Sequence, residues 1–237
     1  MPTEATSDLL LRPADRDDLA AVADLHLQVR TAAVPAMPPV VYDAAFVREY
    51  VESWDLSTHE LWLGERDGSL LGYAMVHDDW LHSLYVAPAE QGSGIGSALL
   101  DLAKGLRPGG FCLWVFESNE PARAFYRHHG LVDLETTDGS GNPERAPEVR
   151  MAWPGEDPLA FLRGLVDDVD AQLGDLLARR VALTRAIQPY RTTSGRDRGR
   201  EAEIAREMAR RAPVLGPERL ARIVDVIVTE SLDAGRG

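Results

Sequence analysis

The sequence predicts two domains of different fold class, an α/β domain over residues 1–154 and an all-α domain over residues 155–237. In the first part, short apolar runs bounded by turn residues alternate with amphipathic helical stretches, as in domains where helices cover a sheet. In the second part, apolar residues keep helical spacing and no strand pattern occurs. The formal charge also changes, from −13 before Trp153-Pro154-Gly155 to zero after it. We therefore place the domain boundary there.

The whole-chain composition narrows the class of protein. With 237 residues, of which 45% are hydrophobic and 27% charged, the chain has the composition of a globular protein. The single cysteine, Cys112, excludes an intramolecular disulfide and a Cys-rich zinc site. No apolar run approaches the roughly 20 residues that span a bilayer, and the first residues show no signal peptide pattern. We expect a cytoplasmic protein with no membrane partner and, because the first part is acidic, no nucleic-acid partner.

The expected elements of the first part follow from hydrophobic spacing and turn residues. A Pro-rich loop separates the first two helices, and Asp67-Gly68 forms the turn of a β-hairpin. In chain order, we expect helices over 14–30 and 43–53, strands over 60–66, 70–76 and 81–86, a helix over 97–106, a strand over 111–115, a helix over 119–129, and strands over 131–136 and 148–153.

The second part is predicted to form three helices, over residues 159–187, 197–211 and 217–232. The first would be about 44 Å long at 1.5 Å per residue, whereas a compact unit of this size has a radius near 12 Å, an order-of-magnitude value. Its apolar residues therefore need a partner, and a dimer of crossing long helices is the simplest solution. Residues 179–222 hold 12 arginines against 5 acidic residues, which suits either a small anion or a solvated helix face.

A glycine-rich segment, Gln91-Gly92-Ser93-Gly94-Ile95-Gly96, follows an expected strand and begins a helix. Glycines at this position let backbone N–H groups converge on an anion, and the helix N-terminus adds its positive dipole end. The segment therefore predicts a pyrophosphate cradle. It lies in mid-domain and reads G-x-G-x-G, whereas a Rossmann fingerprint opens its domain and reads G-x-G-x-x-G. It also lacks the Gly-Lys-Ser/Thr that ends a Walker A loop.

Two segments in this order, LYVAPAEQGSGIGSALLDLA and FCLWVFESNEPARAFYRHHGLV, resemble the GNAT N-acetyltransferases over roughly residues 8–154. The resemblance implies a mixed central sheet with flanking helices, acetyl-CoA as co-substrate and an amine as acceptor. The cofactor-binding residues that it implies are Leu84, Tyr85 and Val86 for the pantetheine arm, the amides of Gln91, Gly92, Ser93, Gly94, Ile95, Gly96 and Ser97 for the pyrophosphate, and Asn119 for the arm.

The resemblance also implies that Tyr126 protonates the departing CoA thiolate. A tyrosine with a pKa near 10 keeps its proton at neutral pH and can donate it. The alternative is that Tyr126 packs with Phe125 as a core residue. The amine must lose a proton, and the candidate bases on neighbouring strands are Glu60, His77, Asp78, Asp79 and His82.

Several of these side chains have simpler interpretations. Asp78-Asp79 can equally be a solvated turn, and His82 a core neighbour. The pair His128-His129 has no third ligand at metal spacing, so we expect no metal site, and Cys112 lies in an apolar strand as an inert buried residue. The sequence does not name the amine.

The second part resembles the α-helical (AroQ) class of chorismate mutases over residues 157–233. The resemblance rests on Arg163 and Arg180, which are 17 residues apart, on Arg191, and on the segment Arg196-Asp197-x-x-Arg200-Glu201. It implies a three-helix fold that forms an intertwined homodimer, and a place in the shikimate pathway of aromatic amino acid biosynthesis. A helical dimerisation arm with a charged face would explain the long helix, but not this charged segment.

In that family, arginines matching Arg163 and Arg180 clamp the two substrate carboxylates, one of them arriving from the partner subunit. Arginine suits this role because its planar fork binds a carboxylate through two hydrogen bonds. The resemblance places the cation of Arg191 near the ether oxygen, Asp197 and Glu201 at the substrate hydroxyl, and Ser231 near a carboxylate. Chorismate rearranges to prephenate without a nucleophile or base, so the site has to hold the chair conformation and stabilise charge.

Two departures from the family pattern concern the ether oxygen. Arg191 stands where a lysine is usual, and Pro189 precedes it closely enough to end or kink the helix. Gly235 stands where the family has Gln or Glu. The pattern fits a slow mutase, or one adapted to 4-amino-4-deoxychorismate, or a lyase that cleaves isochorismate.

Three hypotheses follow for the whole chain. It is a bifunctional enzyme, or a mutase whose GNAT part binds acetyl-CoA as a regulator, or an acetyltransferase that uses its helical part for dimerisation alone. The retained Arg163, Arg180, Asp197 and Glu201 argue against the third hypothesis. The retained Asn119 and Tyr126 argue mildly against the second.

Overall fold

The computed structural model describes residues 8–190 and 196–234. The chain forms two compact units, Met1–Leu162 and Arg163–Gly237. The boundary that we expected at residues 154 and 155 stays a prediction. Within the described ranges, no helix is both long enough and apolar enough to cross a membrane.

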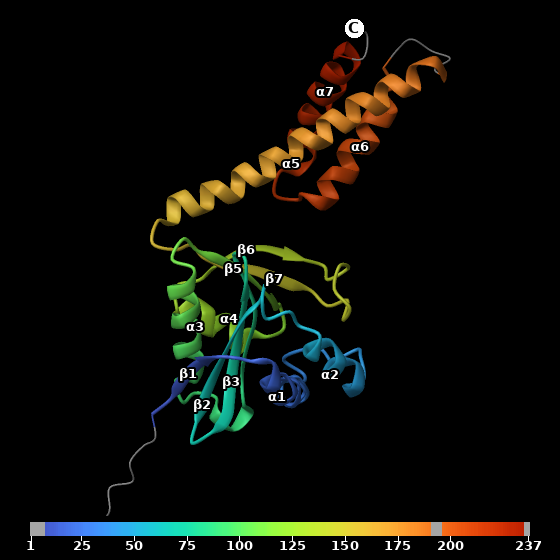
Figure 1. The fold of residues 1–237 in the computed structure, drawn as a ribbon. Helices are drawn as coiled ribbons and strands as arrows, with labels where there is room; N and C mark the ends of the chain where they lie inside the picture. Colours follow the sequence, from blue (N-terminus) through green and yellow to red (C-terminus); the bar gives the residue numbers. More distant parts are fainter. Residues whose placement is uncertain (1–7, 191–195, 235–237) are drawn as a thin grey trace, which may run out of the picture. The chain divides into compact units, whose positions relative to one another are not determined.

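The first unit is built on a seven-stranded sheet with the order β1-β2-β3-β4-β5-β7-β6 (Figure 1). Only β4 and β5 run parallel, and the other neighbours are antiparallel, so the sheet is mixed. The strands are β1 (Leu10–Pro13), β2 (Glu60–Arg66), β3 (Ser69–His77), β4 (Trp80–Val86), β5 (Phe111–Phe116), β6 (Val132–Thr137) and β7 (Glu148–Trp153).

Helices cover the two faces of this sheet, and β3 shows the division because its side chains alternate between faces. Ala74 and Val76 pack in a core with α3 and α4. Tyr73 and Met75 pack in a second core with α1 and α2. The helices are α1 (Leu19–Ala32), α2 (Ala44–Glu52), α3 (Ile95–Leu106) and α4 (Glu120–His128), with short 3-10 turns η1 (Arg16–Asp18) and η2 (Pro88–Glu90). The predicted mixed sheet with flanking helices is confirmed.

Strand β1 was not among the expected elements. It has four residues and ends in Pro13, which has no N–H to donate to a sheet. It is placed by a long-range contact, because Arg12 bridges Asp18 and Glu65 at 2.7 Å each, which ties β1 to β2. A pattern of four residues is too short to show periodicity.

Lys104 joins three elements on the α3 side of the sheet. Its Nζ donates a hydrogen bond to the carbonyl of His129 at 2.8 Å, just after α4. The same ammonium lies 5.8 Å from the centre of the Trp153 ring at the end of β7. The end of α3 is thereby held against both α4 and β7.

The described residues of the second unit form three helices, as predicted. They are α5 (Pro158–Ile187), which begins in the first unit, α6 (Arg198–Arg211) and α7 (Gly216–Ala234), with a short turn η3 (Gln188–Tyr190). The small core lies between α6 and α7, where Ala205, Val224 and Val228 are buried. None of the described residues of α5 is buried, and it exposes about half of each of several apolar side chains, among them Val166, Val169, Leu173, Leu176 and Leu183.

Candidate active sites

A cavity of about 1000 Å³ opens in the first unit where β4 and β5 separate. The two strands are registered at Trp80↔Cys112 near their beginnings. Further along, Leu84, Tyr85 and Val86 pair with β3 on one side and line the cavity on the other. Backbone N–H and C=O groups at such an opening need partners, and an extended ligand can supply them. This is where the pantetheine arm was expected.

The glycine-rich segment forms the next part of the wall. Gly92 and Gly94 have φ angles of 79° and 92°, which side chains with a Cβ rarely adopt. Gly94 precedes α3, and no side chain caps the helix, so its first N–H groups remain available to an anion. Gln91, Gly92, Gly94, Gly96 and Ser97 line the cavity.

Two of the predicted cradle residues do not line the cavity. The Ser93 hydroxyl donates to the carbonyl of Glu90 at 2.6 Å, and the Ile95 side chain is 1% exposed in the core. Their expected contribution is through backbone amides, and this stays a prediction.

Asn119 and Tyr126 reach the same cavity from α4. Asn119 caps the helix, since its side-chain oxygen accepts from the backbone N–H of Ala122 at 3.3 Å. Tyr126 is 8% exposed and contacts the ring of Phe125, so it belongs to the core as well as to the cavity wall. Burial, with a smaller effect from nearby Tyr85, raises the pKa of Tyr126 well above its usual value, so the phenol is neutral at physiological pH.

Of the five candidate bases, His82 lines the cavity. Burial, followed by the neighbouring His77 and His59, lowers the pKa of His82, so its imidazole is neutral at physiological pH. The others lie elsewhere. Glu60 is paired with Arg107, and Nδ1 of His77 donates to the carbonyl of Thr58 at 2.8 Å. Asp78 lies in an exposed turn with a φ of 48°, and Asp79 does not line the cavity.

The cavity also contains four ionisable residues that the sequence did not single out, His26, Arg30, Glu144 and Glu148. Arg30 is 4% exposed and pairs with Glu144 at 2.5 Å. Burial, with a contribution from Arg30, lowers the pKa of His26 to about 4. These residues come from α1 and from around the start of β7, so only the folded chain brings them together.

A second pocket, of about 780 Å³, lies among the helices of the second unit. It brings together three of the predicted site residues, Arg180 from α5 with Asp197 and Glu201 at the start of α6. Arg180 donates to the carbonyl of Ile227 at 3.3 Å, which links α5 to α7. Apolar side chains complete the wall, namely Ile187, Ile204, Val228 and Leu232.

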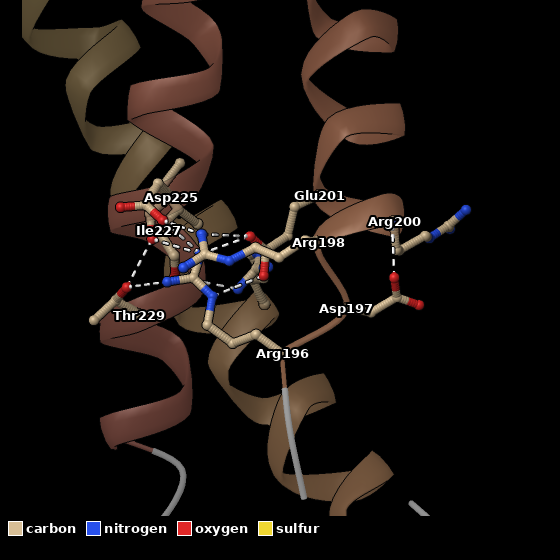
Figure 2. Close-up of polar contacts among 9 residues, drawn as sticks. Arg196, Asp197, Arg198, Arg200, Glu201, Asp225, Ile227 and Thr229 are labelled. Atoms are coloured by element: carbon tan, nitrogen blue, oxygen red, sulfur yellow. Dashed lines mark hydrogen bonds and ion pairs between the residues drawn. The ribbon is translucent and has the colours of Figure 1, made fainter. Parts of the chain in front are cut away.

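A charged network surrounds Glu201 (Figure 2). Arg196 donates from Nε and Nη2 to the two Glu201 oxygens at 2.8 and 2.7 Å. It also bonds Asp225 at 2.7 Å and the Thr229 hydroxyl at 2.9 Å, both on α7. The hydrogen bonds from Arg196 hold the pKa of Glu201 below its usual value.

Asp197 lies apart from this network, and Figure 2 shows it beside Arg200 on the other side of the start of α6. Its side chain caps the helix by accepting from the backbone N–H of Arg200 at 2.9 Å. Arg196, Arg198 and Arg200 all line the pocket, although the sequence assigned roles at the site only to the acidic residues of this segment. Arg196 and Asp225 are 29 residues apart, so no local sequence pattern could have predicted their contact.

Two predicted residues that the structure describes, Arg163 and Ser231, do not line this pocket. Arg163 is exposed on α5, about 25 Å along the helix axis from Arg180. Ser231 is 2% exposed and donates to the carbonyl of Ile227 on its own helix at 2.6 Å. Arg191 and Gly235 lie outside the described residues. Across the described ranges, no group of three or more His, Cys, Asp or Glu side chains is arranged to hold a metal ion.

Comparison with known families assigns each unit separately. Residues 27–131 match the model of the acetyltransferase (GNAT) family, and residues 162–235 match that of chorismate mutase type II. No curated protein matches the chain.

Solved structures resemble the first unit in fold. Apo-form YjaB from Escherichia coli has a TM-score of 0.53 at 18% identity, covering 62% of this chain and 99% of that one. A GCN5-related N-acetyltransferase from Rhodopseudomonas palustris has a TM-score of 0.52 at 20% identity, covering 65% and 99%. The protein yncA from Salmonella typhimurium, solved with its cofactor acetyl-CoA, has a TM-score of 0.50 at 20% identity, covering 64% and 96%.

Proposed function

We propose that this chain, which carries a GNAT acetyltransferase domain followed by a type II chorismate mutase domain, is a bifunctional enzyme. Its helical part would rearrange chorismate to prephenate, and its α/β part would transfer an acetyl group from acetyl-CoA to an amine. We place it in the cytoplasm and in the shikimate pathway of aromatic amino acid biosynthesis. The observation that carries the proposal is the meeting of Arg180, Asp197 and Glu201 around one pocket.

The chemistry of that pocket suits a rigidly held dicarboxylate. Four arginines line it, Arg180, Arg196, Arg198 and Arg200, and apolar side chains complete its wall. In the proposed reaction Arg180 clamps one carboxylate, and Glu201 and Asp197 accept from the substrate hydroxyl. Because the rearrangement is pericyclic, holding the chair conformation and balancing its charge is the whole task of these residues.

A homodimer would complete the site. The uncovered apolar residues of α5 supply a surface for a second copy, and Arg163 lies on the same helix, too far from Arg180 to share a substrate with it. We propose that Arg163 of one subunit binds the second carboxylate in the pocket of its partner. Ser231 would take part only if its hydroxyl left the Ile227 carbonyl.

In the α/β part, the cavity between β4 and β5 would hold the acetyl donor, as supported by the acetyl-CoA complex of yncA. Leu84, Tyr85 and Val86 would bind the arm, Gln91–Ser97 the pyrophosphate, and Asn119 the arm from the α4 side. His82, neutral because its pKa is lowered, would accept a proton from the amine as nitrogen attacks the thioester carbon. Tyr126 would give its proton to the sulfur as the C–S bond breaks.

One set of assays tests the proposal. The purified protein is incubated separately with chorismate, 4-amino-4-deoxychorismate and isochorismate, and the products are identified. It is then given acetyl-CoA with a panel of amines while thiol release is followed. We expect prephenate from chorismate, thiol release with at least one amine, and a dimeric mass by light scattering.

Each failure has a distinct meaning. Rearrangement without acetyl transfer would make the GNAT part a regulator that binds acetyl-CoA. Acetyl transfer without any reaction of the three substrates would leave the helical part as a dimerisation module. A monomeric mass at micromolar concentration would contradict the shared site.

A further inference from the structure

Arg196 is the side chain that connects the two shorter helices of the mutase unit. It lies just before α6, its side chain is 22% exposed, and its guanidinium contacts acceptors on both α6 and α7. The acceptors are the Glu201 carboxylate, the Asp225 carboxylate and the Thr229 hydroxyl. The planar fork of arginine can satisfy these acceptors together, whereas a lysine ammonium would act as a single point charge.

The acceptor that faces the pocket is Glu201, whose side chain is 12% exposed. The charged groups around it are Arg196 and Arg198 from its own segment, Asp225 from α7, and Arg180 across the pocket on α5. Arg198 is more distant, at 3.4 Å, and its other bond is to Asp225 at 2.9 Å. Among these groups, Arg196 therefore makes the close paired contact.

We infer that Arg196 is a positioning residue of the mutase site, which fixes Glu201 in one orientation and keeps it ionised to receive the substrate hydroxyl. The inference rests on the proposed mutase function. Each carboxylate oxygen can accept a second hydrogen bond, so Glu201 can bind a hydroxyl without releasing Arg196. Asp225 and Thr229 hold Arg196 from the other side, which makes them the support of the arrangement.

A purely structural role is the rival explanation, because the same contacts join α6 to α7. The two roles differ in what they predict for the pH dependence of rearrangement. If Arg196 acts through Glu201, its removal raises the pKa of that carboxyl, because burial then acts without the compensating hydrogen bonds. If Arg196 only joins helices, its removal lowers stability and leaves the pH dependence of rearrangement unchanged.

The first experiment measures kcat/KM for rearrangement against pH in the full-length protein and in Arg196→Gln. We expect Arg196→Gln to lower kcat/KM on the order of 10- to 100-fold. We also expect its acid limb, the fall in kcat/KM at low pH, to shift to higher pH by about one unit or more. Asp225→Asn removes the negative charge that Arg196 meets on α7 but leaves both bonds to Glu201. It should therefore lower the melting temperature without shifting the acidic fall in kcat/KM to higher pH. Arg206→Gln is the matched control, because Arg206 is exposed on α6 and donates only to the Ala202 carbonyl among its observed contacts.

A double-mutant cycle tests whether Arg196 acts through Glu201. In a Glu201→Gln background, Arg196→Gln should cost no more than about 2-fold further activity, since the group it positions is already altered. If the loss of activity in the double variant equalled the product of the two single losses, the inference would be overturned. An acid limb that does not move in Arg196→Gln would overturn it as well.

Titration of the Glu201 carboxyl by carbon-13 NMR, assigned with Glu201→Gln, gives the same comparison without any substrate. If the wild-type protein rearranged none of the three substrates, the proposed function would fail while this titration still decided whether Arg196 controls Glu201. Equal pKa values for Glu201 with and without Arg196 would refute the control of ionisation.

Discussion

Trp80 on β4 lies opposite Cys112 on β5, in the only registered pair that joins these parallel strands within the described residues. Both neighbours continue in pairs on their outer sides, β4 with β3 and β5 with β7. The sheet is therefore joined at one end and open at the other, and the cavity lies at the open end. The glycine-rich segment follows the open end of β4 after the short turn η2, which places an anion-binding turn next to the unpaired edge of β4.

Gly94→Asp should abolish acetyl-CoA binding and leave rearrangement unchanged. The backbone φ of 92° disfavours any side chain, and the new carboxylate would repel the pyrophosphate at the start of α3. Calorimetry with acetyl-CoA measures the first effect and a chorismate assay the second. Gly105→Ala, near the end of α3 and with open space around its Cβ position, is the control. Unchanged affinity in Gly94→Asp would refute the cradle.

Tyr126→Phe should lower kcat for acetyl transfer by about 100-fold, within the range for general acid catalysis, with little change in affinity for acetyl-CoA. The phenyl ring keeps the packing against Phe125 while the proton donor is lost. Because burial raises the pKa of Tyr126, the wild-type enzyme should keep its acid form, and its rate, up to at least the ordinary tyrosine pKa of about 10. Steady-state kinetics against pH checks both, and full activity of Tyr126→Phe would leave Tyr126 as a core residue.

Acetyl transfer should fall at acidic pH with a midpoint below the ordinary histidine pKa of about 6.5. Burial and the neighbouring His77 lower the pKa of His82, so the neutral base persists to lower pH and is lost only when protonation occurs. His82→Gln should remove this acid limb and most of the rate, whereas His77→Gln should retain it. The pH profile of kcat/KM measures the difference, and an unaltered limb in His82→Gln would exclude His82 as the base.

Arg163→Ala and Arg180→Ala should each reduce rearrangement by roughly 100- to 1,000-fold, because each leaves a substrate carboxylate unpaired in a partly desolvated pocket. Arg191→Ala should lose less, since that cation is expected to meet only the partial charge on the ether oxygen.

Mixing the two inactive variants under conditions that exchange subunits provides a stronger test. If Arg163 serves the partner's pocket, each mixed dimer has one intact site, and about a quarter of wild-type activity should return. No recovery after verified exchange would place both arginines at the same subunit's site, or neither of them at a site.

The sequence predicted the elements with strong periodicity well. The helix expected over residues 159–187 is Pro158–Ile187, because its apolar spacing extends over many turns. Strand β1 was missed because its position depends on Arg12 reaching Glu65, 53 residues away. The same limit applies to the sites. Gly94 and Tyr126 belong to local motifs, whereas Arg30 with Glu144 and Arg196 with Asp225 are joined only by tertiary contacts.

The side chain of Lys104 has a consequence for a protein proposed to handle a reactive thioester. It is the only lysine in the sequence, and its ammonium is held by the His129 carbonyl with 19% of the side chain exposed. An amine has to be neutral to take up an acetyl group, and a charged, hydrogen-bonded ammonium is a poor nucleophile. With arginine at nearly every other cationic position, the described surface offers the acetyl donor almost no amine of the protein's own. In an enzyme that binds acetyl-CoA, this composition would limit damage by acetylation of its own side chains.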